Sequence, residues 1–233
     1  MRGAGEDALL RCKTVRLFGP LHLSLLAATA AIAAILAFLC RRQPASARTV
    51  RLSLAYGLAA NEIVWWIFRY SHEGIHLANL PLQLCDITLW LSIAACLTLQ
   101  QFIVEALYFS GILGAGMALL TPDLWSPWPS YPAIYFFVVH GGIVVACLVL
   151  IFGQIAKLRP GAWWRAFLAL LGYAGAVGIF NALTGANYMY LRYKPQSGSL
   201  LDVLGPWPVY ILAGAALAAL GFWLLYLPAR PRS

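Results

Sequence analysis

The hydrophobic residues of this 233-residue chain fall into long apolar stretches that short polar connectors separate. Because a helix rises about 1.5 Å per residue, about 20 apolar residues cross the roughly 30 Å hydrocarbon core of a bilayer. The pattern therefore predicts an all-α fold, a polytopic membrane helix bundle with about seven transmembrane helices. We expect these helices at residues 18–40, 49–70, 82–100, 102–120, 131–154, 163–182 and 207–227.

The composition agrees with this pattern, because 62% of the residues are hydrophobic and only 10% are charged. An ordinary soluble domain carries about 25% charged residues. The spans leave almost no chain for a soluble domain. We expect an N-terminal cap at residues 1–17, a seven-helix transmembrane domain at 18–227 and a short C-terminal tail at 228–233.

The net charge of +8 resides in short connectors and at the chain ends. It forms no basic stripe with interleaved aromatic residues, so we expect membrane lipids as partners and no nucleic acid. Seven spans place the N-terminus on one membrane side, here called side A, with the connectors 71–81, 121–130 and 183–206; the opposite side is side B. Side B holds nine basic residues and side A seven. The positive-inside rule then favours a cell-membrane protein with the N-terminus outside and the C-terminus in the cytoplasm, although the basic N-terminus opposes this.

Glycines recur at helix-packing intervals in two of the predicted spans. They are Gly111, Gly114 and Gly116 in one span, and Gly172, Gly175 and Gly178 in another. Small residues at this spacing let helices approach closely. We interpret them as contacts within the chain, with a homo-oligomer interface as the alternative.

Four polar side chains lie inside the predicted spans: Asn61, Glu62, Asp86 and His140. A charge at the bilayer centre costs about 2.5–3.5 kcal/mol on insertion scales, so such groups face the bundle interior or a wet cavity. Helical rise places Asn61, Glu62 and His140 roughly 12–14 Å below side A, and Cys85 and Asp86 roughly 6–8 Å below it. All of them fall in the same half of the membrane. This distribution favours a cavity that opens to side A.

Each of these polar groups also has a structural interpretation. Glu62 and Arg69 share a helical face and are candidates for an ion pair, and Arg69 is alternatively a partner for Asp86. Asn61 is a candidate for an interhelical hydrogen bond. His140 is either a satisfied core histidine or a functional group. The two following glycines would let another group approach it closely.

Four further polar positions are not expected to carry chemistry. Glu105 lies near side B, where we expect it to reach the interface without a function. His72, Glu73 and His76 resemble a metal-ligand cluster, but they occupy a predicted loop without fixed helical spacing, so no metal site is predicted.

Cys85 carries the most nucleophilic type of side chain among the candidate residues. A free cysteine is usually a small buried hydrophobe. Near a helix N-terminus, however, the helix dipole favours the thiolate, and a neighbouring imidazole activates a thiol as a nucleophile. Asp86 would then orient the imidazole or cap the start of the helix. Cys40, Cys96 and Cys147 lie within predicted spans, which argues against a disulfide framework.

Four segments of the chain, "LPLQLCD", "LTPDL", "VVHGG" and "NALTGANYMYLRYKPQSGSLLDVLGPWPVYI", carry a resemblance to a known family. Through them the chain resembles the YwaF-type family of bacterial integral membrane proteins, from about residue 50 onward. That family looks related to an animal multipass protein described as a phospholipid acyltransferase. It looks more distantly related to membrane hydrolases that use a threonine and a histidine within the bilayer.

The resemblance implies a site as well as a fold. Cys85 matches the position of the acyl-accepting cysteine and His140 that of its base. Asn187, or backbone N–H groups near Gly141, would stabilise the oxyanion. Asn181 and Tyr188 in the same block are candidate supporting residues. The resemblance implies no cofactor.

Three functions therefore stay open from the sequence. The first is a lipid acyltransferase or lipid ester hydrolase that uses Cys85 and His140. The second is a transporter or small-solute binding protein in which Asn61, Glu62 and His140 line a cavity. The third is a non-catalytic membrane scaffold in which the polar residues hold the helices in register.

Overall fold

The computed structural model describes residues 15–77, 79–124, 126–195 and 200–230. Most of the expected N-terminal cap and the last residues of the expected tail, 1–14 and 231–233, lie outside the described residues. Throughout the described ranges the regular secondary structure is helical, which confirms the predicted all-α class.

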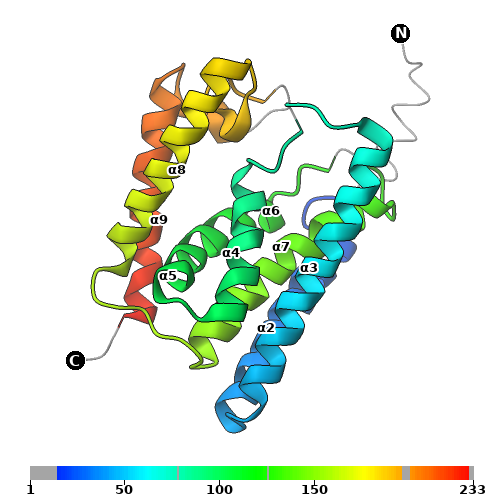
Figure 1. Ribbon diagram of the computed structural model, residues 1–233, viewed down its shortest axis with the longest axis vertical. Helices are drawn as coiled ribbons and strands as arrows, with labels where there is room; N and C mark the ends of the chain where they lie inside the picture. Colours follow the sequence, from blue (N-terminus) through cyan, green and yellow to red (C-terminus); the bar gives the residue numbers. More distant parts are fainter. Residues whose placement is uncertain (1–14, 78, 125, 196–199, 231–233) are drawn as a thin grey trace.

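Seven helical segments of the described chain correspond to the seven predicted spans (Figure 1). They are α2 (Pro20–Arg42), α3 (Ser46–Glu73), α4 (Leu84–Thr98), the continuous run α5 (Gln101–Ser110), η1 (Gly111–Ala115) and α6 (Gly116–Leu120), α7 (Tyr131–Phe152), α8 (Ala162–Thr184) and α9 (Val209–Ala229). Two short 3₁₀ turns, η2 (Tyr188–Tyr190) and η3 (Leu200–Leu204), lie between α8 and α9.

Five of these segments are long and apolar enough to cross a membrane: α2, the α5–α6 run, α7, α8 and α9. The other two differ from the prediction in informative ways. α3 has 28 residues, but it carries charged groups along its length. α4 has only 15 residues, fewer than the about 20 that span a bilayer core. Its residues Leu89, Ile93, Ala95 and Cys96 are buried, so much of α4 packs against other helices instead of lipid.

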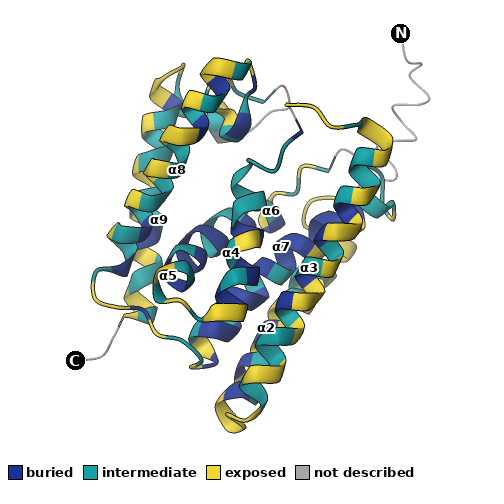
Figure 2. Cartoon of the chain, in the orientation of Figure 1, coloured by how far each residue is buried: buried dark blue, intermediate teal, exposed yellow. Residues whose placement is uncertain are grey.

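Helix α7 forms the centre of the bundle. It packs against α2, α3, α4 and the η1 turn, and most of its residues are buried. Figure 2 shows the buried positions gathered on α4, α5 and α7, whereas α2, α3, α8 and α9 expose residues along their outer faces. These exposed residues include Ile35, Ile67, Leu168 and Leu212. Large apolar side chains on the outside of a bundle suit a lipid environment, where no water penalises them.

The connectors lie at two opposite ends of the bundle (Figure 1). The α3–α4 connector and the η2–η3 segment lie at one end, which is side A. The α2–α3, α4–α5 and α7–α8 connectors lie at the other end, which is side B. The alternation of sides follows the order that the sequence predicts.

The prediction that glycines form close helix contacts within the chain is confirmed at some positions and is wrong at others. A Cβ on Gly111 would lie 2.7 Å from the Cys147 sulfur, so α5 and α7 approach closely where the π-helical turn η1 begins. A Cβ on Gly114 would contact Leu84 at 3.5 Å. At Gly116, Gly172 and Gly175 it would meet nothing within 4 Å, so these three glycines make no close contact within the described chain.

Candidate functional site on side A

Helix α4 begins with a capping box that explains the position of Asp86. Gln83 is the N-cap residue, and its backbone N–H donates to Asp86 Oδ2 at 3.0 Å. The Gln83 side chain in turn accepts from the backbone N–H of Asp86. Such reciprocal bonds satisfy donors at the helix start that have no carbonyl partner in the helix. The interpretation that Asp86 caps the helix is therefore confirmed.

Cys85 occupies the first turn of α4, next to this cap. Its thiol donates to Asp86 Oδ1 across 3.9 Å, a long contact even for sulfur. The predicted partner of Asp86, Arg69, instead forms an ion pair with Glu73, with 3.1 Å between Nε and Oε2. The expected pairing of Arg69 with either Asp86 or Glu62 is wrong, because Glu73 lies one helical turn from Arg69 on an exposed part of α3.

Glu62 lies deeper in the bundle, with 1% of its surface exposed. Its two carboxylate oxygens accept hydrogen bonds from Trp66 Nε1 and from the Tyr135 hydroxyl, each at 2.5 Å. The Tyr135 ring stacks on Trp65 with 4.1 Å between ring centroids, which fixes the hydroxyl against α3. Glu62 is thus satisfied by neutral donors from α3 and α7.

The Asp86 carboxylate lies beside the thiol, with 3.9 Å between its Oδ1 and the Cys85 sulfur. A negative charge nearby opposes a standing thiolate, whereas the N-terminus of α4 favours one. The Asp86 carboxylate lies beside the sulfur and caps that same helix end.

His140 is buried in the middle of α7. Its Nδ1 lies 2.7 Å from the carbonyl oxygen of Phe136, and its ring packs on the Phe136 ring with 4.2 Å between centroids. A carbonyl oxygen only accepts hydrogen bonds, so Nδ1 carries the proton in the neutral imidazole and Nε2 carries the lone pair. Within the described chain no hydrogen bond joins His140 to Cys85.

Asn61 has a buried amide nitrogen without a hydrogen-bond partner in the described chain. The Nδ2 group therefore does not supply the interhelical hydrogen bond that one interpretation expected. Most buried donors in proteins have a partner, so such an atom marks a place where a water or a polar ligand group is expected.

Asn181 and Tyr188 join α8 to the η2 turn on side A. The Asn181 amide donates to the carbonyl oxygen of Tyr188 and accepts from its backbone N–H, both at 2.9 Å. The Tyr188 hydroxyl donates to the carbonyl oxygen of Leu77 at 2.8 Å and accepts from the N–H of Leu80 at 2.7 Å. Burial raises the pKa of this phenol above its usual value. Tyr188 thus fastens the α3–α4 connector to η2.

A second bond links η2 directly to the start of α4. The backbone N–H of Met189 donates to Gln83 Oε1 at 2.9 Å. Tyr173 of α8 adds a bond from its hydroxyl to the carbonyl oxygen of Leu82 at 3.0 Å. The long block after α8 therefore holds the helix start that carries Cys85.

Asn187 is engaged within its own loop. Its Oδ1 accepts from the backbone N–H groups of Arg192 and Tyr193 at 3.0 and 3.2 Å, and its Nδ2 donates to the carbonyl oxygen of Tyr193 at 2.8 Å. The amide organises the turn that follows η2, and it faces the loop rather than a free oxyanion position.

Sequence reasoning missed several of the residues that build this region. Tyr135 and Trp66 are the partners of Glu62, and Gln83 is the cap that links α4 to η2. Trp66 follows Glu62 by one helical turn, a spacing that would have indicated it. Tyr135 and Gln83 reach their partners only through tertiary packing. His22 was also missed; it is fully buried, and its Nε2 lies 2.7 Å from the carbonyl oxygen of Leu119.

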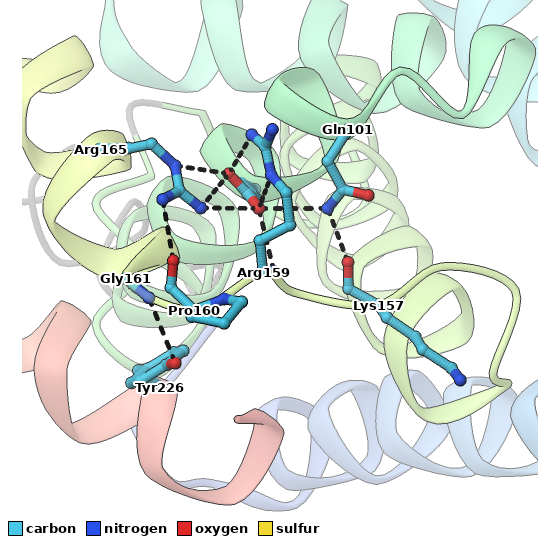
Figure 3. Close-up of polar contacts among 8 residues, drawn as sticks. Gln101, Lys157, Arg159, Pro160, Gly161, Arg165 and Tyr226 are labelled. Atoms are coloured by element: carbon cyan, nitrogen blue, oxygen red, sulfur yellow. Dashed lines mark hydrogen bonds and ion pairs between the residues drawn. The ribbon is translucent and has the colours of Figure 1, made fainter. Parts of the chain in front are cut away.

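Side B contains a separate charge cluster around Glu105 (Figure 3). Its carboxylate is fully buried and accepts hydrogen bonds from Arg159, Arg165 and Gln101. The expectation that Glu105 reaches the interface is wrong, because its side chain is buried and the α7–α8 connector folds over it. Within the described residues, no group of three His, Cys, Asp or Glu side chains could hold a metal ion.

The fold and the site together define a helical integral membrane protein with buried polar groups toward both ends of the bundle. A family model for the TMEM164 family matches residues 17–226. The chain belongs to the TMEM164 family, a membrane protein family. Searches of curated proteins and of solved structures found no match to the chain.

Proposed function

We propose that this protein is a bilayer-embedded lipid acyltransferase or lipid ester hydrolase, with Cys85 as the nucleophile and His140 as the general base. The observation that carries the proposal is the position of Cys85 in the first turn of a capped helix on side A, at the depth of a lipid ester. The resemblance to the YwaF-type family and its acyltransferase relation supports the same assignment.

The chemistry has two balanced steps. In the first, His140 Nε2 takes the thiol proton while the Cys85 sulfur bonds to the ester carbonyl carbon; the intermediate then expels the lysolipid oxygen, which takes the proton back from His140. In the second, His140 takes a proton from a lysolipid hydroxyl or from water, which attacks the thioester and expels the Cys85 sulfur; the sulfur takes the proton back from His140 and the thiol is regenerated. A lysolipid acceptor gives acyl transfer, and water gives hydrolysis.

The tautomer of His140 supports its role as the base. The bond from Nδ1 to the Phe136 carbonyl oxygen leaves the lone pair on Nε2. Because no hydrogen bond joins the imidazole to the thiol in the described chain, the proposal requires a bridging water or the seated substrate to complete the path. Catalytic hydrogen bonds often tighten only when the substrate is bound.

The start of α4 offers donors for the oxyanion. The first four N–H groups of a helix have no carbonyl partner within that helix. In α4 the Gln83 side chain accepts from Asp86, which leaves the backbone N–H groups of Leu84 and Cys85 for an oxyanion beside the sulfur. These donors suit the role better than Asn187, whose amide bonds its own loop.

The proposal also includes an orientation of the protein in the membrane. Side B is proposed to be cytoplasmic, which places Cys85 and its neighbours in the outer half of the cell membrane. A single-cysteine variant that retains only Cys85 would react with a membrane-impermeant thiol reagent from outside intact cells if side A faces outward. Protection in intact cells and reaction only in inverted vesicles would reverse the orientation.

The deciding experiment for the function uses the purified chain in nanodiscs with a fluorescent phospholipid and a cysteine-reactive probe that carries a palmitoyl chain. We expect the probe to modify Cys85, and Cys85→Ser to abolish both modification and release of the fatty acyl group. His140→Ala should lower the rate by about 10²–10⁴-fold, the usual contribution of a general base. Cys96→Ser is the matched control, since Cys96 is buried near the other end of the same helix.

Two results would count against the proposal. Acyl release that persists in folded Cys85→Ser protein would remove Cys85 as the nucleophile. Full activity of His140→Ala would remove the assigned base, since no other residue in the mechanism accepts the thiol proton.

A further inference from the structure

Side B carries the whole net charge of the chain. Nine of the sixteen basic residues lie there, and Glu105 is the single acidic residue of the sequence on that side. The other seven acidic residues equal the seven basic residues of side A in number. We infer that side B binds the headgroup phosphates of anionic phospholipids, with Lys157 and Arg159 as direct contacts. The inference is independent of the proposed function.

The one carboxylate of side B does not neutralise the surface around it. Glu105 is 0% exposed, and its oxygens are shared by the guanidinium groups of Arg159 and Arg165. Two cations with one anion leave one positive charge in excess. Because the Arg159 side chain is 49% exposed, this excess charge reaches the surface of the protein.

The guanidinium of Arg159 keeps a donor for a second anion. Its Nε and Nη2 groups donate to Glu105, whereas Nη1 makes no hydrogen bond within the described residues. The bidentate pair with Glu105 also fixes the orientation of the planar group. A phosphate oxygen that binds Nη1 therefore meets a side chain that is already ordered.

Lys157 lies two residues before Arg159 on the same α7–α8 connector (Figure 3). Its backbone carbonyl oxygen accepts from Gln101 Nε2 at 2.7 Å, which fixes the chain at this point. Its side chain is exposed and extends away from the Glu105 cluster. The connector thus presents an ammonium and a guanidinium close together in the chain, and both groups bind phosphate oxygens.

The α2–α3 connector adds further positive charges beside this one. A Cβ on Gly153, directly after α7, would lie 3.3 Å from the Cβ of Cys40 near the end of α2. The exposed side chains of Arg41 and Arg42 follow Cys40, and the exposed Arg48 lies in the first turn of α3. The two connectors therefore form one basic surface.

Two cation–π contacts place this surface at the level of the lipid headgroups. The Cζ of Arg42 lies 5.1 Å from the ring centroid of Phe38, and the Cζ of Arg165 lies 5.8 Å from that of Trp164. Both aromatic side chains are exposed, and both belong to helices that are apolar enough to cross a membrane. Aromatic residues at span ends lie in the interface, and arginine side chains extend from there to the headgroups. A lipid phosphate in the side B leaflet therefore fits the surface better than a soluble acidic partner does.

The test compares two lipids that differ in headgroup charge. The purified chain in detergent is titrated with phosphatidylglycerol or with phosphatidylcholine that has the same acyl chains, and native mass spectrometry measures the bound lipid. We expect tighter binding of phosphatidylglycerol, with a preference that falls at high ionic strength. Lys157→Gln should weaken phosphatidylglycerol binding about fivefold, the usual contribution of one basic residue at an anionic surface. It should leave phosphatidylcholine binding unchanged.

Lys194→Gln is the matched control, because it removes one lysine from side A and lowers the net charge by the same amount. It should leave phosphatidylglycerol binding unchanged. Lys157 is the substituted residue instead of Arg159, because Arg159 also holds Glu105 and its loss would disturb the fold. Equal affinity of the unmodified chain for the two lipids would overturn the inference and favour a soluble acidic partner for side B. Equal losses in the Lys157→Gln and Lys194→Gln proteins would also overturn it, because they would reflect net charge alone.

Discussion

The carboxylate of Glu105 and the guanidinium of Arg159 form a bidentate ion pair on side B. Oε1 accepts from Arg159 Nε and Oε2 from Arg159 Nη2, both at 2.9 Å, and Arg165 approaches the same carboxylate at 3.2 Å (Figure 3). This geometry is the strong form of the arginine–carboxylate interaction. It fastens the start of α5 to the α7–α8 connector and to the start of α8.

Neutralising Glu105 should destabilise the bundle. Glu105→Gln removes the single carboxylate that compensates two arginines, and breaking a buried pair in this way costs about 3–5 kcal/mol. We expect a value toward the lower end, because the Arg159 side chain is 49% exposed and water replaces part of the interaction. Thermal unfolding in detergent, followed by tryptophan fluorescence, measures the loss.

Glu73→Gln provides the control for that experiment. The ion pair of Glu73 with Arg69 lies on the exposed end of α3, so its removal should change stability by less than about 0.5 kcal/mol. Equal destabilisation by both substitutions would contradict a structural role specific to the side B cluster.

Gln83 should be important for the start of α4. Gln83→Ala removes the side-chain acceptor of the capping box and the acceptor for Met189, and loss of a helix cap costs about 0.5–2 kcal/mol. Hydrogen exchange should accelerate at Met189 and in the first turn of α4. Gln100→Ala is the matched comparison, because Gln100 is the N-cap of α5 but makes no side-chain cap bond. Faster exchange in both variants would argue against the bridge.

The pair of Glu62 and Tyr135 should show energetic coupling. Tyr135→Phe leaves one oxygen of a buried carboxylate without its donor, at a cost of about 1–3 kcal/mol. In a double-mutant cycle with Glu62→Gln we expect a coupling energy of about 0.5–3 kcal/mol. Strictly additive effects on unfolding would mean that the hydrogen bond contributes nothing to stability.

Tyr188 should hold the α3–α4 connector in place. Tyr188→Phe leaves the N–H of Leu80 and the carbonyl oxygen of Leu77 without their side-chain partner, so limited proteolysis should cut the connector at residues 74–83 faster. Tyr193→Phe is a suitable control, because the Tyr193 side chain is largely exposed. Unchanged cleavage in Tyr188→Phe protein would show that other contacts hold the connector.

The sequence predicted the helices well because the bilayer imposes a simple rule. Long apolar stretches separated by short connectors already locate the helices to within a few residues, and the polar residues Glu62, Asp86 and His140 stand out against them. It also fixed the alternation of sides, which places Cys85 near side A. These properties depend on composition and order along the chain, so a local pattern determines them.

The tertiary structure decided which polar side chains pair with one another. The bond of Tyr135 to Glu62 crosses from α7 to α3, Met189 reaches Gln83 across more than 100 positions of the chain, and Arg159 folds back over Glu105. The rotation of each helix about its axis and the path of the connectors set these contacts, and neither has a local signature. That is why Arg69 was paired with the wrong carboxylates and Glu105 was expected at the interface. The depth of each polar group was a property of the sequence, and its partner was a property of the packing.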